Sequence, residues 1–417
     1  MAYVKRTVDL ALQELLTSVG AVLIEGPRGC GKTSTGLEHS ESSIRLDHSP
    51  QLVQLAELNP AALLHGSIPR LLDEWQLAPT LWNAARHEID DRQQRGQFIL
   101  SGSATPAEDV TRHSGAGRLA RLRMRTMSLA ELGASSKQVS LAELAPGTMV
   151  SGTSPLTYAD MADQAVRGGW PALLGASTRQ AQIFNREYCV NLYEAEVQAA
   201  AGSRHNPIRL RRLLESIARN IAGEATLRTL AADVAGAVES TIDPKTIATY
   251  MSALTRVFAL DELPAWSVSL RSKSRLRTAS KLHLADPALA CALLGVGSDR
   301  LAREPEFFGQ IFESMVVRDL RALVAPDFGR VYHYRDNTGL EADAIIEYPD
   351  GRWGAVEVKL GDSRVPDAER NLLTLRDARV NTDVVGQPQF LAVVTAGEFA
   401  YTLPSGVHVI PLATLGV

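Results

Sequence analysis

The sequence predicts an α/β fold that opens with a parallel β-sheet, because short apolar runs alternate with helical patterns along its first third. The predicted strands cover 21–24, 68–72 and 98–100, and the helical patterns cover 8–18, 51–58 and 81–91. The run 21–24 contains no polar residue, which is typical of a central strand that helices cover on both faces.

Composition excludes several classes of protein. The 417 residues include 47 acidic and 43 basic side chains, a net charge of −4, so nucleic-acid binding would depend on local basic patches. A hydrophobic share of 45% excludes a disordered chain. The three cysteines, Cys30, Cys189 and Cys291, are too far apart for a disulfide framework or a CxxC metal site. No signal-like or membrane-spanning stretch occurs, because the longest apolar run, 288–296, is far shorter than the roughly 20 residues a bilayer requires. We therefore expect a cytoplasmic protein without a membrane partner.

A phosphate-binding motif follows the first strand. Residues 26–33 read GPRGCGKT and fit GxxxxGK[ST] between a strand and a predicted helix, which is the context the motif requires. Glycines let backbone N–H groups surround phosphate oxygens, the lysine reaches the terminal phosphates, and the threonine hydroxyl is a ligand for Mg²⁺. The alternative is a glycine turn that matches by chance. The predicted nucleotide-binding residues are Gly26, Pro27, Arg28, Gly29, Cys30, Gly31, Lys32, Thr33, Ser34 and Ser101.

Two further strand ends support a site for nucleoside triphosphate hydrolysis. The strand 68–72 leads into Asp73 and Glu74. Asp73 would join Thr33 in holding Mg²⁺, and Glu74 would polarise the attacking water. Ser101 follows the strand 98–100, where a small polar residue can orient water near the terminal phosphate. The alternatives are a solvated acidic turn for the first strand end and an ordinary strand-end serine for the second.

Five arginines gather between 112 and 125. Arg118, which follows a Gly-Ala-Gly turn, is the predicted arginine finger that would act across a subunit interface, so we expect a homo-oligomer. The alternative is a solvated basic strand face, because Arg121, Arg123 and Arg125 alternate with apolar residues.

A second constellation lies near the carboxyl end. Glu357 and Lys359 share one face of a predicted strand, and Asp343 lies opposite them across a turn at 349–351. Glu313 lies on the predicted helix 306–323. This is the PD-(D/E)XK nuclease pattern, in which Asp343 and Glu357 would bind Mg²⁺, and Glu313 and Lys359 would complete the catalytic set. The alternative is an ordinary hairpin with charged residues outside.

Between the two constellations the order of elements is that of a winged-helix module. After a connector with a predicted helix at 179–200, helices are predicted at 210–221, 227–234 and 245–256, followed by an alternating strand. One face of that strand carries Arg271, Lys273, Arg275 and Arg277. This face is suited to the phosphate backbone of DNA or RNA, although a charged, solvated edge strand gives the same pattern.

The chain resembles bacterial and archaeal AAA-type ATPases with a C-terminal domain of unknown function that has a PD-(D/E)XK-like core. The segments that carry the resemblance are GPRGCGKTS, LLDEWQ, FILSGS, GAGRLARLRMRTMSLAEL, GGWPALL, KLHLADPALACALLG, GQIFESMVVRDL and GLEADAIIE with GAVEVK. The resemblance implies ATP as the nucleotide. One departure is that Ala195-Glu196 stands where the group usually has an Arg-Asp pair.

Together these patterns predict four regions: an ATPase core at 1–145, a helical connector at 146–204, a winged-helix-like domain at 205–280 and a nuclease-like domain at 281–417. The first functional hypothesis is an ATPase whose cycle controls action on nucleic acid, including cleavage. The second is an ATP-switched signalling or interaction protein whose nuclease-like domain is inactive and binds a partner. A nucleotide-regulated transcription factor is a third hypothesis.

Overall fold

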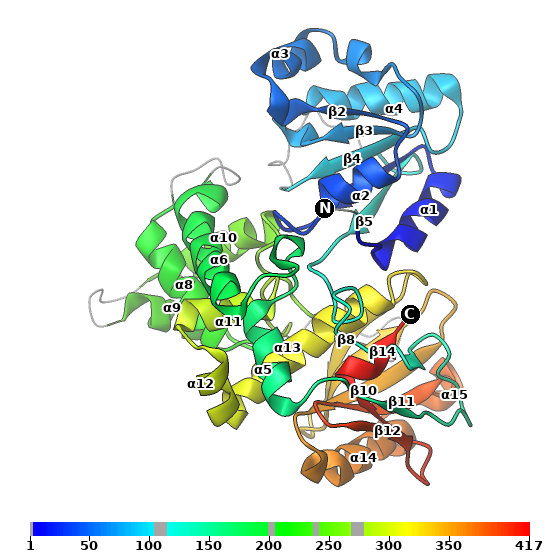
Figure 1. Ribbon diagram of the computed structural model, residues 1–417, viewed down its shortest axis with the longest axis vertical. Helices are drawn as coiled ribbons and strands as arrows, with labels where there is room; N and C mark the ends of the chain where they lie inside the picture. Colours follow the sequence, from blue (N-terminus) through cyan, green and yellow to red (C-terminus); the bar gives the residue numbers. More distant parts are fainter. Residues whose placement is uncertain (1–2, 104–114, 199–204, 237–241, 268–278) are drawn as a thin grey trace.

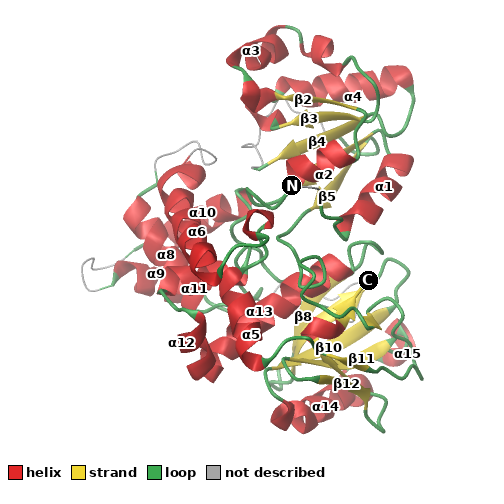
Figure 2. Ribbon diagram, viewed as in Figure 1, coloured by secondary structure: helices red, strands yellow, loops and turns green. Residues whose placement is uncertain are grey.

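The computed structural model describes residues 3–103, 115–198, 205–236, 242–267 and 279–417. The chain forms an N-terminal sheet lobe, a group of helices and a C-terminal sheet lobe (Figure 1). Figure 2 shows that strands are confined to the first and last of these parts. Within the described residues, no helix combines the length and the apolarity needed to cross a bilayer.

The N-terminal lobe is built on a five-stranded sheet in the order β2-β3-β4-β1-β5, and every neighbouring pair is parallel. The prediction of a parallel sheet is thus confirmed. The strands are β1 (Ala21–Glu25), β2 (Ser42–Arg45), β3 (Arg70–Asp73), β4 (Phe98–Gly102) and β5 (Leu119–Arg123). The helices are α1 (Val8–Ser18), α2 (Lys32–Glu38), α3 (Pro50–Leu58) and α4 (Thr80–Arg92).

Alternate strand residues pack into two separate cores. Ala21 and Leu23 contact the core that includes Trp75 and Trp82, beneath α3 and α4. Val22 and Ile24 contact the opposite core, which includes Leu12 of α1. Because both faces of β1 are buried, a continuous apolar run is the sequence that this position requires.

The helical group contains the four helices predicted between residues 179 and 256, with their starts shifted by a few residues, and three helices that were not predicted. Its members are α5 (Tyr158–Arg167), α6 (Thr178–Asn191), α8 (Pro207–Arg219), α9 (Leu227–Ala235), α10 (Pro244–Arg256), α11 (Pro287–Leu294) and α12 (Ser298–Arg303). The predicted helix 179–200 is not one regular α-helix. The helix α6 ends at Asn191, and a π-helix, Leu192–Glu196, follows it directly. Most of the predicted wing, including Arg271, Lys273, Arg275 and Arg277, lies outside the described residues.

The C-terminal lobe contains a seven-stranded mixed sheet in the order β7-β12-β13-β11-β10-β9-β8. One face packs on α13 and the other on α14. The strands are β7 (Gly152–Thr153), β8 (Arg330–Arg335), β9 (Glu341–Glu347), β10 (Trp353–Lys359), β11 (Phe390–Thr395), β12 (Phe399–Thr402) and β13 (His408–Pro411). The helices are α13 (Pro305–Leu323), α14 (Val365–Thr374), a π-helix (Leu375–Arg379) and α15 (Thr382–Val385).

The chain that leaves the N-terminal lobe crosses the C-terminal lobe before it enters the helical group. β6 (Val139–Ser140) pairs with β14 (Leu415–Gly416), and β7 pairs with β12. The predicted boundary at residue 145 therefore falls within a segment whose strands belong to the C-terminal lobe.

Asp261 forms ion pairs with arginines from two separate parts of the chain. Its carboxylate oxygens lie 2.9 Å from Arg125 Nε, 2.7 Å from Arg321 Nη1 and 3.9 Å from Arg123 Nη2. Burial alone would raise the pKa of Asp261, but the three guanidinium groups outweigh it and hold the pKa far below its usual value. The carboxylate therefore ties the segment after β5 to α13.

We expect Asp261→Asn to lower the free energy of unfolding by about 3 to 5 kcal/mol at neutral pH, because it leaves the buried Arg321 and the half-buried Arg123 and Arg125 without their counter-charge. The folded-state pKa is depressed, so the stabilisation exists above the unfolded pKa of about 3.9 and fades as pH falls further. Urea titrations at pH 7 and pH 3.5 measure both effects. Asp299→Asn, at an exposed position of α12, is the control, and equal midpoints for Asp261→Asn and wild type at pH 7 would contradict the prediction.

Candidate functional site

The phosphate loop connects β1 to α2 in the conformation that the glycines permit. Gly29 and Gly31 have φ angles of 79° and 108°, a region that L-residues rarely adopt. Lys32 folds back so that its Nζ donates to the carbonyls of Gly26 and Pro27, both at 2.9 Å. These bonds hold the buried ammonium against the backbone of the phosphate loop. Ser34, on the first turn of α2, is exposed.

The side chains expected to hold Mg²⁺ lie together at the carboxyl edge of the sheet. Thr33 Oγ1 donates to Asp73, with 3.0 Å to each carboxylate oxygen. Ser101 also donates to Asp73, and Arg45 Nε lies 3.4 Å from it. A hydroxyl and a carboxylate are the hard oxygen ligands that suit Mg²⁺. The residues present therefore fit this ion.

Glu74 follows Asp73 with a left-handed backbone, φ 54°. Its carboxylate accepts hydrogen bonds from Gln76 and from Ser103, the latter at 3.4 Å. Such a backbone conformation is sparsely populated and is common at functional sites. Here it marks the point where β3 ends and the short 3₁₀ helix Trp75–Leu77 begins.

Arg118 lies at the other end of the sheet. Its carbonyl accepts from Ala21 N at the start of β1, and its guanidinium pairs with Asp90 of α4 at 2.5 Å. Within one chain it is therefore remote from the phosphate loop, and the finger role stays a prediction for a neighbouring subunit. Arg121 pairs with Glu25 at 2.9 Å, and Arg112 lies outside the described residues.

The helical group contributes a carboxylate that sequence reasoning did not include in the site. Glu196 Oε1, on the π-helix, lies 3.3 Å from Arg28 Nη1 of the phosphate loop. Tyr188 donates to the carbonyl of Arg28 at 3.3 Å, and its ring packs against Trp170 in a tilted arrangement, with 4.5 Å between ring centroids. Burial raises the pKa of Glu196, and Glu74 adds to that effect, whereas Arg28 and Lys32 oppose it. A π-helix often marks a functional position.

A buried ionic network surrounds the segment 125–131. Arg6 donates to Glu131 at 2.8 Å, to the Cys30 carbonyl of the phosphate loop at 2.8 Å and to the Arg125 carbonyl at 2.9 Å. Burial raises the pKa of Glu131, but Arg6 and backbone N–H groups outweigh it and lower the net value. The remaining members are Asp286, which accepts from Thr126 Oγ1, Gly169 N and Arg318 Nη1, and Asp319, which accepts from Leu129 N and Arg318 Nε. Several of these residues lie in the segments that carry the family resemblance. That resemblance is the signal in the sequence that could have identified them.

In the C-terminal lobe the four predicted residues come together. The antiparallel register that pairs Val356 with Ala344 brings Asp343 beside Glu357. Asp343 Oδ2 accepts from the Val358 N–H at 2.8 Å, and Lys359 Nζ lies 2.5 Å from Glu357 and 3.6 Å from Asp343. Glu313 projects from α13 into the same cluster.

Lys281 is a fifth member that the sequence analysis did not identify. Its Nζ lies 2.6 Å from Glu313 Oε1 and 3.3 Å from Asp343 Oδ1. Burial raises the pKa of Glu313 to about 8 and that of Glu357 to about 7, and Asp343 adds to both shifts. Lys281 and Lys359 instead hold the pKa of Asp343 below its usual value against the effect of burial. Among the described residues, no group of three His, Cys, Asp or Glu is arranged to hold a metal ion.

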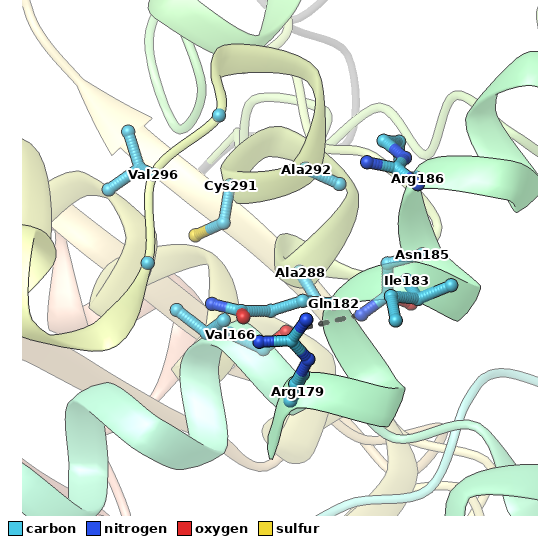
Figure 3. Close-up of a pocket in the computed structure, with 12 residues that line it drawn as sticks. Val166, Arg179, Gln182, Ile183, Asn185, Arg186, Ala288, Cys291, Ala292 and Val296 are labelled. Atoms are coloured by element: carbon cyan, nitrogen blue, oxygen red, sulfur yellow. Dashed lines mark hydrogen bonds between the residues drawn. The ribbon is translucent and has the colours of Figure 1, made fainter. Parts of the chain in front are cut away.

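A separate pocket of about 410 Å³ lies between α6 and α11 (Figure 3). Arg179 and Arg186 of α6 and Cys291 of α11 line it, and Asn185 Nδ2 donates to the Val166 carbonyl at 3.1 Å. Burial raises the pKa of the Cys291 thiol to about 12, so this cysteine is not a nucleophile at neutral pH. None of the predicted site residues lines this pocket.

Comparisons with known protein families match three separate stretches of the chain. Residues 18–133 match the family described as an AAA domain, residues 158–300 match the domain of unknown function DUF8612, and residues 308–415 match the domain of unknown function DUF4143. Similar curated relatives are the uncharacterized proteins Rv2008c of Mycobacterium tuberculosis and Mb2031c of Mycobacterium bovis. Each is 26% identical over 420 residues, which is 98% of this chain and 83% of the relative. The chain thus has an ATPase-like domain and a DUF4143 domain.

We expect Glu196→Gln to bind MgATP about fivefold more tightly than wild type, because it removes a negative charge near the phosphates and frees Arg28 to contact them. Titration with a fluorescent ATP analogue measures the dissociation constant. Glu194→Gln, on the same π-helix but exposed, should leave it unchanged, and Arg28→Gln should abolish the gain. Weaker binding by Glu196→Gln would instead mean that the carboxylate supports the nucleotide.

Proposed function

We propose that this protein is a magnesium-dependent ATPase whose nucleotide cycle controls a nuclease-like C-terminal module, with a winged-helix element, that acts on nucleic acid. The observation that carries the ATPase proposal is the phosphate loop with Lys32 held against its backbone and Thr33 paired with Asp73. Phosphate oxygens would replace the Gly26 and Pro27 carbonyls as acceptors for Lys32. When bound, Mg²⁺ neutralises charge on the phosphates.

The chain's own residues supply the remaining chemistry of hydrolysis. Glu74, restrained by Gln76 and Ser103, would accept a proton from the attacking water. Ser101, bonded to Asp73, would keep that carboxylate oriented toward Thr33. Arg118 of a neighbouring subunit would neutralise charge that develops in the transition state.

The buried ionic network offers a physical route from the nucleotide to the C-terminal lobe. Arg6 contacts the phosphate loop at the Cys30 carbonyl and also contacts Glu131. Asp319 holds the same segment from α13, the helix that carries Glu313. A shift of the loop on nucleotide binding would therefore act on hydrogen bonds that reach the second site.

We expect Lys32→Ala to bind MgATP at least about tenfold more weakly, because a charge-assisted contact to phosphate is lost. Glu74→Gln should keep its affinity but lower kcat by about 10² to 10⁴, the range for removal of a general base. Calorimetry and phosphate release measure the two quantities separately. Lys245→Ala, at an exposed position of α10, is the control. Unchanged affinity of Lys32→Ala would refute the proposal.

Cleavage of nucleic acid is a second candidate activity, and the convergence of Glu313, Asp343, Glu357 and Lys359 favours it. Backbone geometry supports it as well, because β9 and β10 fix Asp343 and Glu357 on adjacent strands. If the module does not cleave, the same cluster fits an ATP-switched interaction protein in which this lobe binds a partner.

We expect wild-type protein to nick plasmid DNA in buffer containing Mg²⁺ and ATP, and Asp343→Ala to show no nicking because it loses the central carboxylate of the cluster. Agarose-gel analysis of supercoiled plasmid measures the effect. Asp350→Ala, in the exposed turn between the same strands, is the matched control. Nicking that persists in Asp343→Ala would show that the site assignment is wrong. If neither wild type nor Asp343→Ala nicks the plasmid, the result would favour the interaction hypothesis.

A further inference from the structure

The charged groups of the C-terminal cluster form an alternating chain. Glu313, Lys281, Asp343, Lys359 and Glu357 contact one another in that order, with distances of 2.6, 3.3, 3.6 and 2.5 Å. Three carboxylates thus face two ammonium groups. Each lysine lies between two carboxylates, so the alternation compensates most of the buried charge.

Lys281 is held in place by its backbone. Its N–H donates to the Leu263 carbonyl at 3.0 Å, and its own carbonyl accepts from Leu263 N at 2.9 Å. Its side chain is only 8% exposed. A buried ammonium is tolerated only where opposite charges compensate for its lost hydration, and Glu313 and Asp343 supply them.

A divalent cation needs the same oxygen atoms. Mg²⁺ and comparable ions bind carboxylate oxygens at about 2.0 to 2.6 Å, and Lys281 Nζ already lies 2.6 Å from Glu313 Oε1. Two cations cannot occupy that space, because their mutual repulsion at such a separation is large in a buried site. The residues present therefore do not fit a metal ion in this conformation.

We propose that Lys281 is the resident cation of the C-terminal cluster and that, in this conformation, it excludes divalent metal from Asp343 and Glu313. This inference rests on the nuclease-like site proposed above and is independent of ATP hydrolysis. Lys281 is a positioning residue, since it acts by occupying the carboxylates. Metal-dependent chemistry at this site would require that Lys281 first be withdrawn.

The test is direct measurement of Mn²⁺ binding, without nucleotide, by electron paramagnetic resonance. The difference between each protein and its Asp343→Asn counterpart counts only ions at this cluster and removes any ion bound near Thr33 and Asp73. We expect no difference for wild type, and a gain of one bound Mn²⁺ at this cluster in Lys281→Met, because the competing positive charge is gone. Lys245→Met should behave as wild type.

Wild type alone also tests the proposal, should Lys281→Met fail to fold by circular dichroism. A site in wild type that Asp343→Asn removes would overturn the proposal, as would a folded Lys281→Met that gains no such site. Because no step uses ATP, these outcomes are distinct from failure of Lys32→Ala to affect nucleotide binding.

Discussion

The arrangement of the three parts depends on the pairing of buried carboxylates around the segment 125–131. Glu131 is neutralised by Arg6, whereas Asp286 and Asp319 share Arg318. Removal of one partner from a buried ion pair costs about 3 to 5 kcal/mol, because the other charge is left buried without compensation. These bonds also have fixed directions, unlike apolar contacts. The network therefore specifies how the N-terminal lobe, the helical group and the C-terminal lobe meet, in addition to holding them together.

The same pairing places the two candidate sites on one continuous set of contacts. Arg6 contacts the phosphate loop, and Arg318 lies five residues beyond Glu313 on α13. At about 1.5 Å of rise per residue, that spacing is roughly 8 Å along a rigid helix. Asp286 in turn follows Lys281 by five residues in the segment that runs beside α13. A continuous set of contacts thus connects the phosphate loop with the elements that carry Glu313 and Lys281.

Sequence reasoning succeeded where the determining pattern is local. The buried strand β1 follows from four adjacent apolar residues, and the proximity of Asp343 to Glu357 follows from strand periodicity and one turn. It did not identify contacts between distant segments. Glu196 and Arg28 are 168 residues apart, and Lys281 and Asp343 are 62 apart. Lys281 begins the segment KLHLADPALACALLG, and Glu196 lies where the chain departs from the group's usual pair. Neither signal identifies a contact partner, because the surroundings of both residues are created only by the tertiary fold.

The two sites balance charge in different ways, and this difference determines which of them is ready to bind. Lys32 bonds to neutral backbone carbonyls, so a phosphate can replace those acceptors and gain a charge-assisted contact. Lys281 bonds to two carboxylates, and its removal would leave both of them buried with less compensation. A ligand can therefore enter the first site without rearrangement, whereas the second needs a movement of the 281–286 segment or of α13. The buried ionic network contacts both of these elements through Asp286 and Arg318, and it contacts the phosphate loop through Arg6. The two sites are therefore joined by contacts, although they compensate charge by different means.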